Sequence, residues 1–255
     1  MKNQFVADLN DYFKYGLLRA LTRDPSASLL GIWWLLTRDD ANGHGGIEDH
    51  LKDVPRYQSC DPDLLNHLER IRKPATRFVS SVKAYSVVPG ARYWPDSSID
   101  ASDPHAIAEA SHSRLSDPYE RMMDFRKMQD HFQPCGAVFA DPDNGIETRS
   151  ANRSERYVRW ADLVALFHTG KSLIVYQHKP RGESLDNKLP ELARQACDLM
   201  GANAYGLACG RGTQRGEVGF LMIPQDSASE WFRRATDGFL KSYGAFARRV
   251  SAGSD

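Results

Sequence analysis

The stretch GAVFADPDNG, residues 136–145, decides the fold class of this chain. Its first half is apolar on both faces, which predicts a strand buried between two layers of helices. Its second half predicts a turn, because Asp and Asn side chains bond their own backbone and Gly tolerates positive φ. Residues 29–37 and 172–176 form similar apolar runs, and helical patterns separate the runs. This alternation predicts a three-layer α/β/α fold built on an open, mostly parallel sheet.

Apolar periodicity and capping residues predict the helices. They are expected over residues 10–23, 61–72, 117–132, 157–167, 184–200 and 227–250. Asn10 or Asp11 would cap the first helix. Ser227 with Glu230 would form a capping box for the last helix.

The rest of the chain predicts one hairpin and one insertion. Residues 204–209 and 218–223 flank the turn-like sequence GRGTQRGE, which predicts an antiparallel β-hairpin near the C-terminus. Residues 83–112 are irregular and contain several prolines, which predicts a long surface loop. We therefore expect a single α/β domain over residues 1–255 with a loop insertion at 83–112.

Composition excludes several classes of protein. The chain has 255 residues, with 33 Lys and Arg against 33 Asp and Glu, so a generally basic nucleic-acid-binding surface is excluded. Its four cysteines contain no C-x-x-C pair, which argues against a zinc ribbon, a redox dithiol or a disulfide framework. No apolar run approaches the roughly 20 residues of a membrane span, and the first residues lack the apolar core of a signal peptide. We expect a cytoplasmic protein that contacts no membrane.

Polar side chains follow each predicted strand at its carboxyl end, where open α/β sheets bind ligands. The catalytic candidates are four acids and a histidine at these ends: Asp39, Asp40, Asp141, Asp143 and His178. The substrate-binding candidates lie beside them: Asn42, Gly43, Asn144, Tyr176 and Gln177. We expect these groups to line one cavity, with the two carboxylates of the D-P-D-N-G turn facing solvent. Each group also has a structural interpretation, as a turn, a helix cap or a core histidine.

Basic residues gather at the same edge of the predicted sheet. Arg149 and Arg153 follow the D-P-D-N-G turn, and Lys179 and Arg181 follow the third strand. Such a local patch would suit the phosphates of a DNA backbone beside a catalytic pocket. DNA is the partner that this pattern predicts, and no obligate protein partner is inferred.

Two resemblances point to nucleic-acid enzymes. Pro142-Asp143 followed by Gln177-His178-Lys179 resembles the metal site of PD-(D/E)xK nucleases, although a predicted helix separates its halves here. The order strand, D-P-D-N, helix, strand, helix and terminal hairpin resembles the second half of S-adenosylmethionine-dependent methyltransferases. There D-P-D-N would match the D-P-P-Y motif that holds the target base. The chain departs from that family in having no G-x-G after the first strand and no aromatic residue at Asn144.

A third resemblance is to the uracil-DNA glycosylase superfamily, a three-layer α/β fold. The sequence TRDDANGHGG, residues 37–46, resembles its first motif, and YQHKP, residues 176–180, resembles its histidine loop. The family's G-Q-D-P-Y and H-P-S strings are absent. The whole pattern is also similar to uncharacterised bacterial proteins from phage-defence settings. The resemblance implies a DNA glycosylase that removes a modified phage base.

A monofunctional glycosylase needs neither metal nor cofactor, and the inventory of polar residues suits it. Asp141 or Asp143 would stabilise positive charge on the sugar. Asn144 and Gln177 would read the edge of the flipped base, while His178 would stabilise the departing base.

Two further roles complete the glycosylase hypothesis. Asp39 or Asp40 would orient the attacking water, and Tyr176, Trp33 or Trp34 would stack on the base, although both tryptophans are more typical of a core. A non-catalytic nucleotide-binding or partner-binding module stays open as an alternative.

Overall fold

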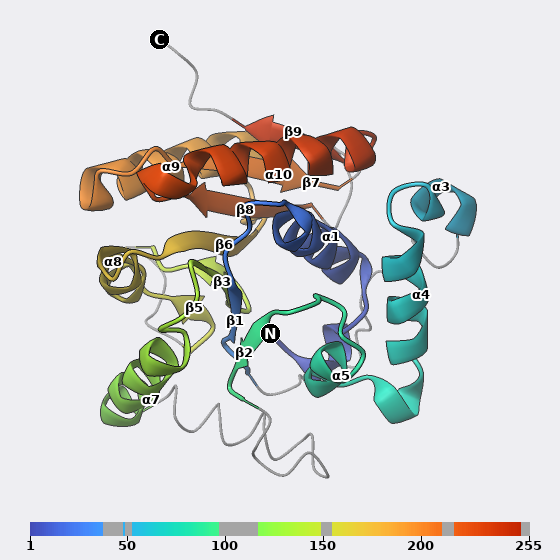
Figure 1. The fold of residues 1–255 in the computed structure, drawn as a ribbon, viewed down its shortest axis with the longest axis horizontal. Coiled ribbons are helices and arrows are strands. Elements are labelled where there is room, and N and C mark those ends of the chain that lie inside the picture. Colours follow the sequence, from blue (N-terminus) through green and yellow to red (C-terminus); the bar gives the residue numbers. More distant parts are fainter. Residues whose placement is uncertain (38–47, 49–52, 97–116, 149–154, 211–216, 251–255) are drawn as a thin grey trace.

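The computed structural model describes residues 1–37, 48, 53–96, 117–148, 155–210 and 217–250. Within them lies a seven-stranded sheet of order β2-β1-β3-β6-β8-β7-β9 (Figure 1). The strands span Arg92–Trp94 (β2), Leu30–Trp34 (β1), Ala137–Asp141 (β3), Ser172–His178 (β6), Val218–Ile223 (β8), Tyr205–Cys209 (β7) and Ala247–Val250 (β9). Neighbours from β2 to β6 are parallel, β8 is antiparallel to both β6 and β7, and β9 is antiparallel to β7. All strands except β8 and β9 thus point the same way, which confirms a mostly parallel sheet.

Helices cover both faces of the sheet, which confirms the three-layer α/β/α fold (Figure 1). One face packs against α1 (Leu9–Arg23), α4 (Pro62–Ile71), α5 (Val79–Ala84) and α10 (Ser229–Tyr243). The other packs against α7 (Pro118–His131), α8 (Trp160–His168) and α9 (Leu185–Met200). Short elements complete the fold: η1 (Asn3–Phe5), α3 (Val54–Gln58), η2 (Pro74–Thr76), η3 (Asp226–Ala228), and the parallel pair β4 (Gly145–Ile146) and β5 (Tyr157–Val158). The predicted C-terminal hairpin is the antiparallel pair of β7 and β8.

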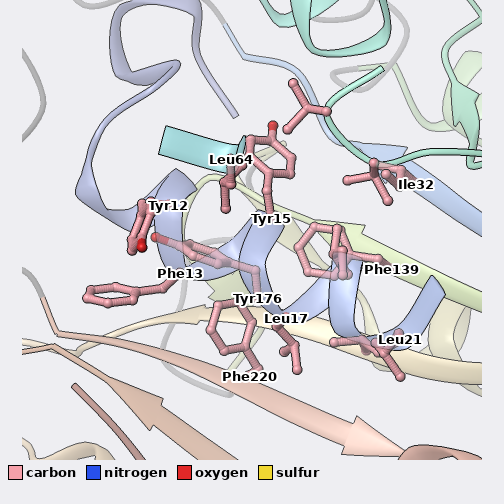
Figure 2. Close-up of a cluster of buried hydrophobic side chains, with 14 of the residues drawn as sticks. Tyr12, Phe13, Tyr15, Leu17, Leu21, Ile32, Leu64, Phe139, Tyr176 and Phe220 are labelled. Carbon is pink, nitrogen blue, oxygen red and sulfur yellow. The ribbon is translucent and has the colours of Figure 1, made fainter. Parts of the chain in front are cut away.

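Side chains of β1 alternate between the two cores, as the pleat of a strand requires. Ile32 and Trp34 enter the core under α1, while Trp33 enters the core under α7 and α8. Both tryptophans are buried, so neither is free to stack on a ligand. Figure 2 shows the first core, in which aromatic residues of α1 meet those of β6 and β8: Tyr12, Phe13, Tyr15, Tyr176 and Phe220.

Helix caps match the sequence prediction where the capping pair is local and unambiguous. Asp61, Asp117 and Ser184 cap α4, α7 and α9, each accepting backbone N–H groups of the first turn. The predicted cap of the first helix is wrong, because Asp8 takes that place and accepts the Asp11 N–H at 3.0 Å.

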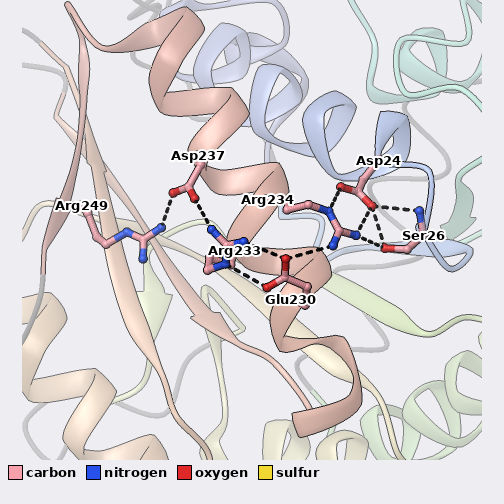
Figure 3. A network of polar contacts seen from close by, with 7 residues as sticks. All are labelled: Asp24, Ser26, Glu230, Arg233, Arg234, Asp237 and Arg249. Atoms are coloured by element: carbon pink, nitrogen blue, oxygen red, sulfur yellow. Dashed lines mark hydrogen bonds and ion pairs between the residues drawn. The ribbon is translucent and has the colours of Figure 1, made fainter.

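The C-terminal prediction is wrong in two respects. The predicted Ser227–Glu230 capping box does not form, since η3 precedes α10 and the N-cap residue Ala228 has no side-chain acceptor. The predicted helix over residues 227–250 ends at Tyr243, and Ala247–Val250 pairs with β7 as the edge strand β9. Arginines of α10 and β9 form an ion-pair network that ties this edge to the end of α1 (Figure 3): Asp24, Ser26, Glu230, Arg233, Arg234, Asp237 and Arg249.

Two boundaries and the insertion also differ from prediction. The helix predicted from residue 157 begins at Trp160, because Tyr157–Val158 pairs with β4. The third predicted strand extends through His178 to match β8. The predicted loop 83–112 contains an edge strand, β2, parallel to β1, and its residues 97–112 lie outside the described chain. All four cysteines are free.

Candidate functional site

The topology marks one crevice. From β1 the chain moves to β2 on one side and later to β3 on the other, so the strand order reverses between β1 and β3. Ligands of open α/β proteins bind beyond the carboxyl ends of the strands at such a switch point. Asp141, the last residue of β3, lies opposite Trp34 of β1 and accepts the Leu35 N–H at its carbonyl. The D-P-D-N-G corner therefore starts at this crevice.

A buried ionic cluster from α1 faces the corner. The Lys14 ammonium lies 2.8 Å from Asp141 Oδ2 and 2.6 Å from Asp11 Oδ1. Asp8, at the N-cap of α1, adds a third carboxyl group, and all four side chains are at most 4% exposed. Burial and the nearby Asp11 charge raise the pKa of Asp8 to about 8. Burial opposes the charge of Lys14, yet Asp11 and Asp141 raise the pKa of its ammonium above the ordinary value.

The second carboxylate of the corner is also turned inward. Asp143 Oδ2 lies 3.3 Å from the Lys2 ammonium, and the residue is 9% exposed. Burial opposes ionisation, but the positive charges of the Met1 amino group and Lys2 lower the pKa of Asp143. The expectation that both carboxylates face solvent is therefore wrong. Each is buried because it is paired with a lysine from the first 14 residues.

Gln177 holds the corner from the opposite side. Its Oε1 accepts the Ile146 N–H at 3.0 Å, and its Nε2 donates to the carbonyls of His178 at 2.9 Å and Asn144 at 3.5 Å. The side chain is 4% exposed. Its amide is thus occupied by backbone groups of the corner and of its own strand.

His178 and Tyr176 form a pair at the end of β6. The Tyr176 hydroxyl lies 3.4 Å from His178 Nε2, and the two rings meet edge to face. Tyr176 is buried among the α1 aromatics and cannot stack on a ligand, whereas His178 is exposed. Of the two, His178 is the side chain that a ligand can reach.

A cleft of about 1550 Å³ opens beside this pair, between the corner, the start of α8 and the start of α9. Its wall includes Asn144, Tyr157, Trp160, His178 and Arg181. Lys179, predicted to bind DNA phosphates, also lines the cleft but pairs with the buried Glu217 at 3.1 Å. Lys188 in the same wall pairs with Glu191 at 3.0 Å. Charges in the cleft are thus partly neutralised by neighbouring acids.

The structure brings most of the predicted site residues to one edge of the sheet. Those gathered there are Asp141, Asp143, Asn144, Tyr176, Gln177, His178, Lys179 and Arg181. Six predicted residues lie outside the described chain: Asp39, Asp40, Asn42, Gly43, Arg149 and Arg153. The sequence prediction missed Lys2, Asp8, Asp11 and Lys14. A spacing of three from Asp8 to Asp11 to Lys14, which places these side chains on one face of the first helix, was the available signal.

No protein-family model and no curated protein matches this chain. None of the described helices is long and apolar enough to cross a membrane. In the described part of the chain, no group of three or more His, Cys, Asp or Glu side chains is arranged to hold a metal ion.

Proposed function

We propose that this chain is an S-adenosylmethionine-dependent methyltransferase that acts on an amine of a nucleobase. The observation that carries the proposal is the place of β8, which runs antiparallel between β6 and β7. Together with a D-P-D-N corner on the strand beside β1, this arrangement resembles that of S-adenosylmethionine-dependent methyltransferases. A likeness of fold is an analogy, so the proposal also needs support from the site.

The residues at the switch point fit the cofactor. S-adenosylmethionine carries two positive groups, a sulfonium and an ammonium, and three carboxyl groups lie around Lys14. Asp8, whose pKa burial raises to about 8, would ionise when a cation binds beside it. Buried polar atoms at the carboxyl end of β1 and on α1 have no hydrogen-bond partner among the described residues: Trp34 Nε1, Thr37 Oγ1 and Tyr15 Oη. Asp8, Asp11 and Thr37 would hold the cofactor, which supplies the methyl group when bound.

The cleft on the other side of the corner would hold the acceptor. Tyr157 and Trp160 offer aromatic surface for a planar base turned out of its strand. Asn144 lies between this surface and His178. The acceptor nitrogen gains a methyl group and loses one proton, and His178 is the exposed base in the wall that would take this proton.

Calorimetry with S-adenosylmethionine, followed by transfer of its labelled methyl group to DNA and to RNA, tests the proposal. We expect binding and a methylated base by mass spectrometry. A His178→Gln variant should keep cofactor binding, and its transfer rate should fall about 10²–10³-fold, as expected for the loss of a general base. Absence of cofactor binding at millimolar concentration would overturn the proposal.

DNA glycosylase is a second candidate, favoured by the exposed His178 beside an aromatic cleft. In that reaction His178 would stabilise the departing base. Ion pairing of Asp141 and Asp143 leaves neither carboxylate free to act on a sugar, which shifts that role to Asp39 or Asp40. Release of free base in the same mass-spectrometry experiment, without methylation, would select this candidate.

The other hypotheses are separated by the same experiment. Cut strands that depend on Mg²⁺ would select the nuclease, for which Lys179 would first have to leave Glu217. Binding without any product would select a non-catalytic module. DNA as the partner and a role in phage defence stay predictions.

A further inference from the structure

The D-P-D-N-G corner is clamped from both sides. Lys14 and Lys2 bind Asp141 and Asp143 on one side, and Gln177 binds the backbone on the other. Every residue from position 141 to 145 is buried except Asn144, which is half-buried. The clamp therefore leaves one residue of the corner open to the cleft.

Gln177 borders the cleft, but its amide is bonded to the backbone of the corner and of its own strand. Its acceptor oxygen is taken by the Ile146 N–H, and both hydrogens of its amide have carbonyl acceptors within 3.5 Å. A carboxamide has two donor hydrogens, and here both are directed at backbone carbonyls. The prediction that Gln177 reads a base edge thus finds no support in its contacts.

Gly145 shows how closely the two segments approach. Its φ is +113°, a conformation that L residues with a side chain rarely adopt, and a Cβ here would lie 2.3 Å from Gln177 Oε1. The contact between Gln177 and the corner therefore depends on a glycine at position 145. The glycine lets the amide reach the corner backbone, and the amide holds the glycine in its unusual conformation.

We infer that Gln177 is a positioning residue that fixes the corner. Of the corner residues, only Asn144 then presents its side chain to the acceptor. The Asn144 backbone is held at both ends, since its N–H donates to Arg156 O at 2.9 Å and its carbonyl accepts from Gln177. Its side chain lines the cleft and is half-buried. It can offer both a donor and an acceptor to one polar edge of a planar acceptor.

This inference rests on the proposed function only for the identity of the reaction. The clamp itself is a property of the fold, so it can be measured without substrate. Hydrogen exchange of the Ile146 amide reports the Gln177 bond directly. Methyl transfer to DNA, if present, reports whether the corner must be fixed for the reaction.

Gln177→Met removes the amide while keeping the length and flexibility of the side chain. Gln58→Met is the matched control, because it makes the same chemical change at an exposed residue at the end of α3 that does not line the cleft. Asn144→Ala removes the proposed contact and leaves the clamp. Gly145→Ala disturbs the clamp from the other side and serves as a second probe if Gln177→Met folds poorly.

We expect Gln177→Met to speed exchange of the Ile146 amide about tenfold, the effect of losing one hydrogen bond. It should lower kcat of methyl transfer and leave the affinity for S-adenosylmethionine within about twofold of wild type, since the cofactor crevice is not touched. Asn144→Ala should leave exchange unchanged and raise KM for DNA. Gln58→Met should change neither the exchange of the Ile146 amide nor the kinetics of methyl transfer.

Unchanged exchange in both Gln177→Met and Gly145→Ala would overturn the clamp. Faster exchange of the Ile146 amide in Gln177→Met, with kcat of methyl transfer unchanged, would overturn the positioning role. Should the wild-type protein neither bind S-adenosylmethionine nor methylate DNA, the proposed function fails, and the exchange measurement alone then decides whether the clamp exists.

Discussion

Replacing Lys14 by Met tests whether the ionic cluster under the corner is as buried and as strongly paired as the structure indicates. Lys14 is 3% exposed and lies 2.8 Å from Asp141 and 2.6 Å from Asp11. At an effective dielectric constant of about 20, one such contact is worth roughly 6 kcal/mol of attraction. Most of that attraction offsets the cost of removing the charges from water. Removing one partner of a buried pair therefore costs about 3–5 kcal/mol net.

Equilibrium unfolding in urea between pH 5 and pH 8 measures this cost. In Lys14→Met the Asp11 carboxyl group loses the Lys14 charge and keeps the nearby Asp141 charge, which raises the pKa of Asp11 in the folded state further above that of the unfolded chain. The folded variant then binds more protons than the unfolded one, so its stability falls as the pH rises. The difference between wild type and variant should grow from pH 5 to pH 8.

Two further variants make the result specific. Lys188→Met removes a lysine that is 6% exposed, but its partner Glu191 is half exposed, so we expect a cost below about 1 kcal/mol. Adding Asp141→Asn to Lys14→Met should recover part of the loss, since one of the two unpaired carboxylates is then neutral. A Lys14→Met cost no larger than that of Lys188→Met at pH 8, or a cost that shrinks as pH rises, would refute the reasoning.

Three other predictions concern groups outside this pair. Asp8→Asn should gain stability relative to wild type as pH rises from about 5 to 8, because burial raises the pKa of Asp8 to about 8 and the folded carboxyl group keeps in that range a proton that the unfolded one loses; urea unfolding at several pH values measures this. Arg234→Gln should raise the pKa of Asp24 from about 2 toward its ordinary value, which NMR titration detects, and the stability that the pair contributes should be lost between about pH 4 and pH 2. Gly31→Ala should cost about 1–3 kcal/mol in urea unfolding, because the new Cβ would lie 2.8 Å from the Phe132 ring.

Each of these has a clear contrary result. A pH-independent difference for Asp8→Asn would mean that this carboxyl group is ionised in the folded protein. An unchanged Asp24 resonance in Arg234→Gln would mean that the ion pair in Figure 3 does not hold the carboxylate in solution. Gly238→Ala is the matched control for Gly31→Ala, since no atom lies within 4 Å of its Cβ position in α10. This control should stabilise the folded protein by about 1 kcal/mol.

Local sequence was sufficient to predict the central strands and most of the helix starts. The apolar runs that became β1, β3 and β6 are long enough and apolar enough on both faces to exclude other interpretations. Asp61, Asp117 and Ser184 are recognisable caps because the groups that they bond lie within three residues. Interactions over such short separations can be predicted from the order of residues alone.

The C-terminal edge of the sheet shows where local preference for helix or strand no longer predicts the structure. Residues 247–250 continue an amphipathic pattern that predicts a helix, but they form β9 because β7 has an open edge with which they can pair. Pairing with a strand about 40 residues earlier is a tertiary interaction. It outweighs the modest differences in intrinsic preference between helix and strand.

Interactions between distant segments also built the candidate site. Lys14 and Asp141 are separated by 127 positions, and each is of a residue type that is rarely buried unless it is paired. Their order in the chain does not indicate the pairing, which arises because α1 packs on one face of the sheet with Lys14 beside the carboxyl end of β3. For the same reason the D-P-D-N-G turn could be predicted from its residues, while the inward direction of its carboxylates and its clamping by Gln177 depend on which segments the packed core brings together.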